Sequence, residues 1–193
     1  MRVGLLGGSF DPPHHGHLTL ARRCADALAL ARVRFEVAYR PPHKQDRPLT
    51  PYADRVALVR AAIAVDPRLE LSTLEGERRG LSYTVDTLEQ LRRAAPADRL
   101  WFLIGEDSLA ELMSWRDPEG IAARARLGVY RRPGSAARVP PLFAGRVDFV
   151  DGPPIDISSS EIRARCRRGA PIADQLPPAV AALIRSKGLY RDA

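Results

Sequence analysis

The alternation of two kinds of apolar pattern is the feature of this sequence that most constrains its fold. Short apolar runs typical of buried strands alternate with longer segments in which apolar residues recur every three or four positions. Strands are expected at residues 2–6, 33–38, 69–74, 100–104, 127–130 and 147–150, and helices at 17–30, 51–65, 84–95, 108–113, 118–123, 159–168 and 178–186. This alternation predicts an α/β fold: a doubly wound, mostly parallel sheet with helices on both faces and a small C-terminal helical segment.

Chain length and composition bear on the domain count and the compartment. The 193 residues are 45% hydrophobic, and neither a Gly/Ser-rich linker nor an internal repeat divides them, so we expect one domain over residues 1–193. The apolar runs are far shorter than the ~18 residues of a membrane span, and the N-terminal one is too short for a signal peptide. With Cys24 and Cys166 expected as free thiols, the sequence favours a cytoplasmic protein with no membrane partner.

The charge of the chain is compatible with anionic ligands. The formal net charge is +7, from 30 basic and 23 acidic residues. A nucleic-acid-binding module would be expected to combine clustered basic residues with exposed aromatic ones. Here aromatic residues make up only 6% and the basic residues are dispersed, so we expect no nucleic-acid partner and keep such a module as a remote alternative. The sequence leaves a homo-oligomer open.

The segment after the first expected strand carries the strongest functional motif. It reads Gly7-Gly8-Ser9-Phe10-Asp11-Pro12-Pro13-His14-His15-Gly16-His17 and leads directly into a helix. Adjacent glycines let the backbone turn sharply and approach a ligand, and side chains three apart on a helix can point to the same side. Because helix N-termini attract anions, His14 and His17 are candidates for gripping a phosphate chain. The segment is neither a P-loop nor a dinucleotide fingerprint.

A second motif lies near the C-terminus, at Ile157-Ser158-Ser159-Ser160-Glu161-Ile162-Arg163. The serines can cap a helix, and Arg163, one turn into that helix, can reach an anion at its start. An ordinary capped helix would also explain this segment taken alone.

Both motifs resemble those of the nucleotidylyltransferase superfamily. The first matches the pattern Gly-x-Phe-Asp-Pro-x-(His/Thr)-x-Gly-His, and the second resembles Ile-Ser-Ser-Ser/Thr-x-Ile-Arg in the form found in the pyridine-nucleotide branch. The resemblance implies that His14 and His17 bind the ATP phosphates and stabilise the transition state, and that the second motif holds the β and γ phosphates. The expected ATP-binding residues are Gly7, Gly8, Ser9, Phe10, His14, His17, Asp107, Ile157, Ser158, Ser159, Ser160 and Arg163.

Asp107 enters this set for its place in Gly105-Glu106-Asp107, directly after the strand expected at residues 100–104. An acid at the carboxyl end of a strand suits a pair of ribose hydroxyls. An Asp that caps the next helix is an alternative, and both can hold. The resemblance implies a contact with the adenosine side of ATP.

Three further segments are similar to the acceptor site of that branch. Pro41-Pro42-His43-Lys44 places a lysine after the second strand, and Thr84 is expected to cap the helix that follows Ser82-Tyr83. The resemblance implies that backbone amides there receive a nicotinate carboxylate and that Trp115 stacks on the pyridine ring; Trp115 could equally be core. The expected residues for nicotinate mononucleotide are Lys44, Tyr83, Thr84, Trp115 and Arg116.

The activity implied by the resemblance is adenylyl transfer from ATP to nicotinate mononucleotide, giving deamido-NAD and pyrophosphate in NAD biosynthesis. The acceptor phosphate is largely a dianion near neutral pH, since its second pKa is about 6, and needs no general base. Mg²⁺ is expected on the ATP oxygens, as Mg-ATP, with no metal site on the protein. Nicotinamide mononucleotide or phosphopantetheine as acceptor, and a non-catalytic nucleotide sensor, remain alternatives.

Overall fold

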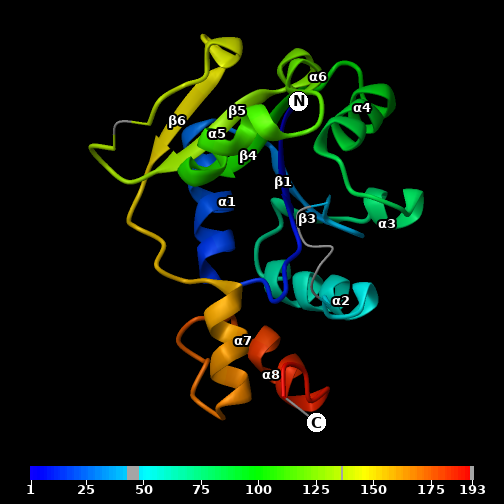
Figure 1. The fold of residues 1–193 in the computed structure, drawn as a ribbon, viewed down its shortest axis with the longest axis vertical. Coiled ribbons are helices and arrows are strands. Elements are labelled where there is room, and N and C mark those ends of the chain that lie inside the picture. Colours follow the sequence, from blue (N-terminus) through cyan, green and yellow to red (C-terminus); the bar gives the residue numbers. More distant parts are fainter. Residues whose placement is uncertain (43–47, 136, 192–193) are drawn as a thin grey trace.

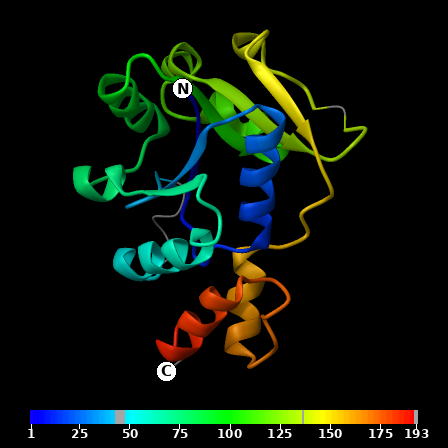
Figure 2. The same cartoon turned by 180° about the vertical axis from the view of Figure 1, so that it is seen from behind.

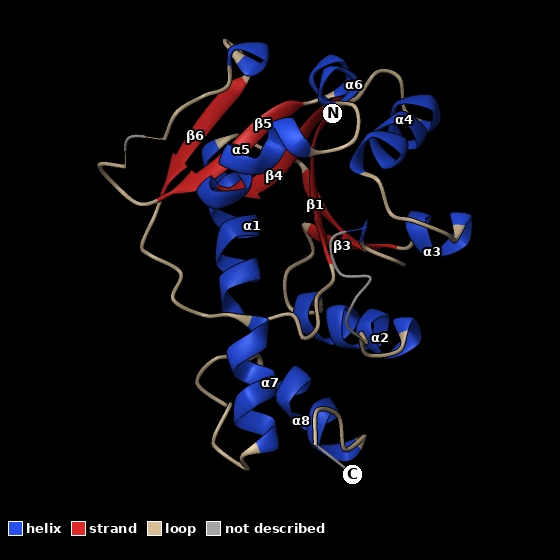
Figure 3. Cartoon of the chain, in the orientation of Figure 1, coloured by secondary structure: helices blue, strands red, loops and turns tan. Residues whose placement is uncertain are grey.

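The central element of the fold is a parallel sheet. The computed structural model describes residues 1–42, 48–135 and 137–191. Within them, six strands run in the order β3-β2-β1-β4-β5-β6, and every neighbouring pair is parallel (Figures 1 and 3). They are β1 (Arg2–Gly8), β2 (Arg32–Val37), β3 (Leu69–Ser72), β4 (Arg99–Gly105), β5 (Arg126–Arg131) and β6 (Val147–Asp151). The predicted doubly wound parallel α/β sheet is confirmed.

Helices cover both faces of this sheet. They are α1 (His15–Ala27), α2 (Tyr52–Ile63), α3 (Leu74–Arg78), α4 (Thr84–Ala94), α5 (Glu106–Glu111), α6 (Pro118–Arg124), α7 (Ser159–Arg167) and α8 (Pro178–Ser186), with short 3₁₀ turns η2 (Leu112–Ser114) and η3 (Pro141–Phe143). The helix α5 lies in front of the sheet in Figure 1, whereas α1 lies in front of it in the reverse view of Figure 2.

Two apolar clusters form the core, one on each face. Consecutive residues of a strand point to opposite faces, and Phe102 and Leu103 of β4 accordingly belong to different clusters. One cluster packs β-strand side chains against α1, α2 and α8, and the other packs them against α4, α5 and α6. Burial on both faces explains why the strands appear in the sequence as nearly continuous apolar runs.

Element boundaries differ from the predicted ones in a few places. The strand expected at 69–74 ends at Ser72, and Leu74 instead opens the short helix α3, which was not predicted. Gly76 and three charged residues of α3 hide any helical apolar pattern. The helix expected at 17–30 begins at His15 and ends at Ala27, before Ala29, whose φ of 49° is not helical.

The strand order reverses its direction of growth between β1 and β4. The chain places β2 and β3 on one side of β1, then crosses to add β4, β5 and β6 on the other. In sheets of this kind the crevice beyond the carboxyl ends of the strands at this point is the usual ligand site. Both cysteines are free, as predicted. Across the described ranges, no helix has the length and apolar character needed to cross a membrane.

Candidate active site

The loop that follows β1 forms the floor of the candidate site. Gly7 and Gly8 are the last residues of β1, which corrects the expectation that they form the turn; the chain turns only after them. Phe10 adopts a left-handed φ of 48°, a conformation that costs a side-chain-bearing residue about 1–3 kcal/mol. Its ring is 2% exposed and packs against Phe35 and His17, with ring centroids 5.4 and 5.0 Å away. These packing contacts hold the loop in this conformation.

The two histidines of the first motif lie side by side at the start of α1. His14 is the N-cap residue, and its backbone N–H donates to Nδ1 of His17 at 3.2 Å. Their ring centroids are 3.8 Å apart, so both imidazoles point to the same side, as their spacing predicted.

The electrostatic state of His14 is set by burial. Its side chain is 6% exposed, and burial, together with the charge of His15, lowers its pKa from 6.5 to about 4. His14 is therefore neutral at pH 7. Its Nδ1 is buried and has no hydrogen-bond partner among the described residues.

The second motif meets the first. Ser158 caps α7 as predicted, its hydroxyl accepting from the N–H of Glu161 at 3.1 Å. The Ser159 hydroxyl donates to the carbonyl of Pro12 at 2.8 Å, and Nη1 of Arg163 donates to the carbonyl of Asp11 at 2.6 Å. The N-terminal ends of α1 and α7 accordingly lie together in Figure 1. Two helix N-termini, each a region of positive potential, converge beside the histidines.

A buried arginine that sequence reasoning missed holds the surrounding loops. Arg55 of α2 is 1% exposed and donates to the carbonyls of Ser9 at 2.9 Å, Ala38 at 2.7 Å, Tyr39 at 3.2 Å and Thr50 at 3.0 Å. Burial lowers the pKa of its guanidinium. The loops after β1 and β2 are therefore hydrogen-bonded to one cation. The burial of Arg55 could have been predicted from the sequence, because position 55 lies on the same helical face as the buried apolar residues of α2.

The predicted acceptor segment lies at the start of α4. The N-cap is Tyr83 rather than Thr84, which is the first helical residue, so the expected capping by Thr84 is wrong by one position. The Arg116 guanidinium lies 4.3 Å from the Tyr83 ring centroid, and Trp115 packs edge-on against Phe102 at 5.7 Å. Tyr83, Thr84 and Trp115 are half-buried and Arg116 is exposed. The structure thus brings Tyr83 and Arg116 into contact.

Ser82 ties the acceptor segment to the loop after β2. Its hydroxyl accepts from the N–H groups of Tyr39 at 2.9 Å and Arg40 at 3.2 Å, and its own N–H donates to the Arg40 carbonyl at 3.0 Å. This connection was not predicted. Lys44, assigned to the same loop, lies outside the described residues.

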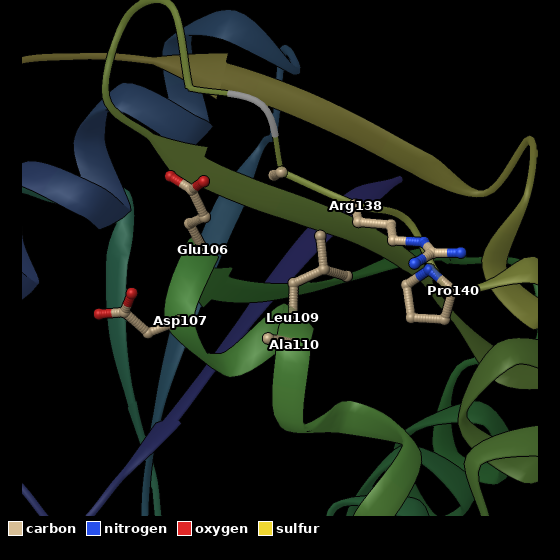
Figure 4. A pocket seen from close by; sticks show the side chains of 7 residues that line it. Glu106, Asp107, Leu109, Ala110, Arg138 and Pro140 are labelled. Atoms are coloured by element: carbon tan, nitrogen blue, oxygen red, sulfur yellow. The ribbon is translucent and has the colours of Figure 1, made fainter.

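Asp107 lies just beyond the carboxyl end of β4. Gly105 caps α5, so Asp107 sits in its first turn instead of capping it, and its side chain is exposed. With Glu106, Leu109 and Arg138 it lines a cavity of about 440 Å³ between α5 and the segment after β5 (Figure 4). The Ser135 hydroxyl donates to the carboxylate of Glu106. An acidic residue thus borders an open cavity beyond β4.

Comparison with known proteins identifies the family to which this chain belongs. A family model described as cytidylyltransferase-like matches residues 5–165. The chain is 43% identical to a "Probable nicotinate-nucleotide adenylyltransferase" of Thermomicrobium roseum, over 98% of this chain and 92% of that protein. It is 44% identical to a protein of the same name from Thermus thermophilus, over 99% and 100% of the two chains. The chain belongs to the nicotinate-nucleotide adenylyltransferase family.

The same fold is found in a solved structure of more distant sequence. The nicotinic acid mononucleotide adenylyltransferase of Plasmodium falciparum, complexed with NaAD, superposes with a TM-score of 0.80 at 19% identity, covering 98% of this chain and 97% of that one. In the chain described here, two hydrogen bonds join the two sequence motifs directly. Asp107 and the Tyr83–Arg116 pair lie on other elements of the fold.

Proposed function

We propose that this chain transfers the adenylyl group of ATP to nicotinate mononucleotide, yielding deamido-NAD and pyrophosphate in NAD biosynthesis. The observation that carries the proposal is the junction of the two motifs, in which Ser159 bonds to Pro12 and Arg163 to Asp11 beside the adjacent rings of His14 and His17. The names of relatives 43% and 44% identical over nearly the whole chain support the choice of acceptor.

The ATP phosphates are assigned to the two converging helix N-termini. An oxygen of the acceptor phosphate attacks the α-phosphorus in line, the bond between that phosphorus and the β-bridging oxygen breaks, and pyrophosphate leaves. His14, neutral in the free protein, and His17 donate to the phosphate oxygens, and Arg163 offsets charge at the outer phosphates. The remaining assigned residues are Gly7, Gly8, Ser9, Phe10, Ile157, Ser158, Ser159 and Ser160, with Asp107 toward the adenosine.

The nicotinate mononucleotide is assigned to the start of α4. Backbone N–H groups at Tyr83, the N-cap, and at Thr84, the first residue of the 11-residue helix, can donate to a carboxylate in a region of positive potential. Trp115 supplies a stacking surface, and Arg116, held over the Tyr83 ring, supplies a cation. Lys44 is assigned to the acceptor phosphate.

Mg²⁺ is proposed to enter as Mg-ATP. Within residues 1–42, 48–135 and 137–191, no three His, Cys, Asp or Glu side chains gather as a metal site. Mg²⁺ keeps several waters and commonly binds substrate phosphates. We further propose a cytoplasmic location, supported by the free thiols of Cys24 and Cys166, and a single catalytic domain over residues 1–193, supported by the contacts of α7 with the β1 loop.

The decisive experiment is pyrophosphate release with ATP, Mg²⁺ and three acceptors: nicotinate mononucleotide, nicotinamide mononucleotide and phosphopantetheine. The proposal expects the highest kcat/KM with nicotinate mononucleotide and a product whose mass equals that of deamido-NAD. Turnover restricted to phosphopantetheine, or none with any acceptor, would refute it.

A further inference from the structure

Asp11 is the point at which three distant segments meet the β1 loop. Its side chain is 3% exposed; Oδ1 accepts from the Tyr190 hydroxyl at 2.8 Å, and Oδ2 accepts from the N–H of Thr50 at 3.4 Å. Its carbonyl accepts from Arg163 at 2.6 Å. Arg163 belongs to the second motif and Thr50 to the segment before α2, but Tyr190 belongs to neither motif. It reaches Asp11 across 179 positions of the sequence.

The conformation of Tyr190 is unusual and specific. Its φ of 64° lies in the left-handed region, which a tyrosine adopts only when its surroundings impose it. Those surroundings are well defined: Lys187 pairs with Asp54 of α2, and the N–H of Leu189 bonds to the carbonyl of Ile184 at 3.0 Å. The Tyr190 ring packs against the core cluster of α1, α2 and α8. These contacts hold the chain beyond α8 in a conformation in which the Tyr190 hydroxyl reaches the Asp11 carboxylate.

We propose that Tyr190 is a positioning residue for adenylyl transfer, acting through Asp11 to hold the loop that carries His14. The inference rests on the proposed function. Asp11 stands three positions before His14, and its neighbour Phe10 is itself held in a left-handed conformation. Burial and the Asp11 carboxylate raise the pKa of Tyr190, so the phenol stays protonated and keeps donating.

Loss of this hydroxyl should affect the chemical step more than acceptor binding. A buried carboxylate that loses a donor must find another, and the small backbone shift this requires would displace His14 and His17. Transition states that depend on alignment tolerate little displacement of the groups around them. The residues assigned to the acceptor, Tyr83 and Thr84, stand at the start of α4, on the other side of the sheet core.

Tyr190→Phe tests the inference, with Tyr130→Phe as the matched control. Tyr130 also donates one hydrogen bond, to the carbonyl of Pro153 at 2.7 Å, but does not contact Asp11. We expect Tyr190→Phe to lower kcat roughly tenfold and ATP affinity several-fold, while the KM for the acceptor changes less than about twofold. The control should lose similar stability toward urea and keep kcat within about twofold of wild type.

Two outcomes would overturn the positioning role: kcat and ATP affinity of Tyr190→Phe within twofold of wild type, or an equal kinetic loss in the control. Calorimetric titration with ATP alone separates this inference from the proposed function. If wild type fails to adenylate nicotinate mononucleotide, the proposed function is refuted. Equal ATP affinity in wild type and Tyr190→Phe would then refute the inference too, whereas a weakened affinity would show that Tyr190 still positions a loop that binds ATP.

Discussion

The buried carboxyl of Glu36 makes the stability of this protein depend on pH in a way that one substitution should abolish. Glu36, on β2, is 1% exposed; it accepts from the Ser72 hydroxyl and from the N–H of Glu75 at 2.9 Å. Burial raises its pKa from 4.5 to about 7, with Glu75 adding repulsion, while the two hydrogen bonds partly offset the rise. The native state therefore keeps this proton over a range in which the unfolded chain has released it.

The sign follows from proton linkage. Between pH 4.5 and about 7 the native state binds more protons than the unfolded state, so the free energy of unfolding falls as the pH rises. The contribution is complete below pH 4.5 and is lost by the time the pH has passed 7. Each pH unit in the interval changes the free energy of unfolding by about 1.4 kcal/mol, which gives roughly 3 kcal/mol across it.

His14 acts in the opposite direction and would mask the effect in wild type alone. Its pKa is lowered from 6.5 to about 4, so its contribution to the free energy of unfolding is present above pH 6.5 and is lost as the pH falls toward 4. The two slopes oppose one another between pH 4.5 and 6.5 and are of similar size. Only the difference between wild type and a variant at position 36 isolates the carboxyl.

Glu36→Gln is that variant, because a glutamine keeps an oxygen for the N–H of Glu75 but does not ionise. Urea unfolding, followed by tryptophan fluorescence between about pH 4.5 and 8, should show the variant gaining roughly 3 kcal/mol relative to wild type as the pH rises. Glu119→Gln, at an exposed position, serves as the control. A wild-type–variant difference that is constant with pH would refute the reasoning.

Three further predictions concern the proposed reaction. His17→Ala should lower turnover about 10²–10³-fold, by removing a transition-state donor worth roughly 3–4 kcal/mol, without unfolding the protein; near-normal turnover at saturating ATP would contradict this. Arg163→Ala should weaken ATP binding by about 1.5–3 kcal/mol, measured by calorimetry, and AMP binding far less, so equal losses would place Arg163 away from the outer phosphates. Wild type should prefer nicotinate over nicotinamide mononucleotide by roughly tenfold or more in kcat/KM, because an amide NH₂ placed against the α4 N–H groups is left unpaired at a cost of ~1–3 kcal/mol. Trp115→Ala should lower kcat/KM for both acceptors equally, and a changed ratio would assign the selectivity to Trp115 instead.

The layered fold could be predicted because its signals are local. Each buried strand, such as the one containing Phe102 and Leu103, is apolar on both sides and is bounded by polar residues within a few positions. The position of each strand in the sheet could not be predicted in the same way, because pairing joins residues far apart in the chain. The helix α3 was not predicted for a different reason: five residues with Gly76 at their centre are too few to show the apolar periodicity of a helix.

The two motifs name the residues that we propose face the phosphates, but they do not predict what holds those residues in place. The supporting contacts run from side chains to backbone carbonyls, as from Arg55 to Ser9 and from Arg163 to Asp11, and a carbonyl carries no residue-specific signal in a sequence. Arg55 could have been noticed as a charge on an apolar helix face. The bond from Tyr190 to Asp11 had no local signal at all.

These inward-turned carbonyls also account for the direction of the loop amides. In a trans peptide the C=O and the following N–H point to opposite sides. The Ser9 carbonyl points to the buried guanidinium of Arg55, and the N–H of Phe10 therefore points away from it. The Arg55 guanidinium beneath the loop donates a hydrogen bond to the Ser9 carbonyl, which would otherwise repel an anion. The N–H of Phe10 is left pointing to the opposite side of the loop. By this geometry a buried arginine fixes which face of the β1 loop presents donors and which presents acceptors, and it does so from beneath the phosphate site proposed above.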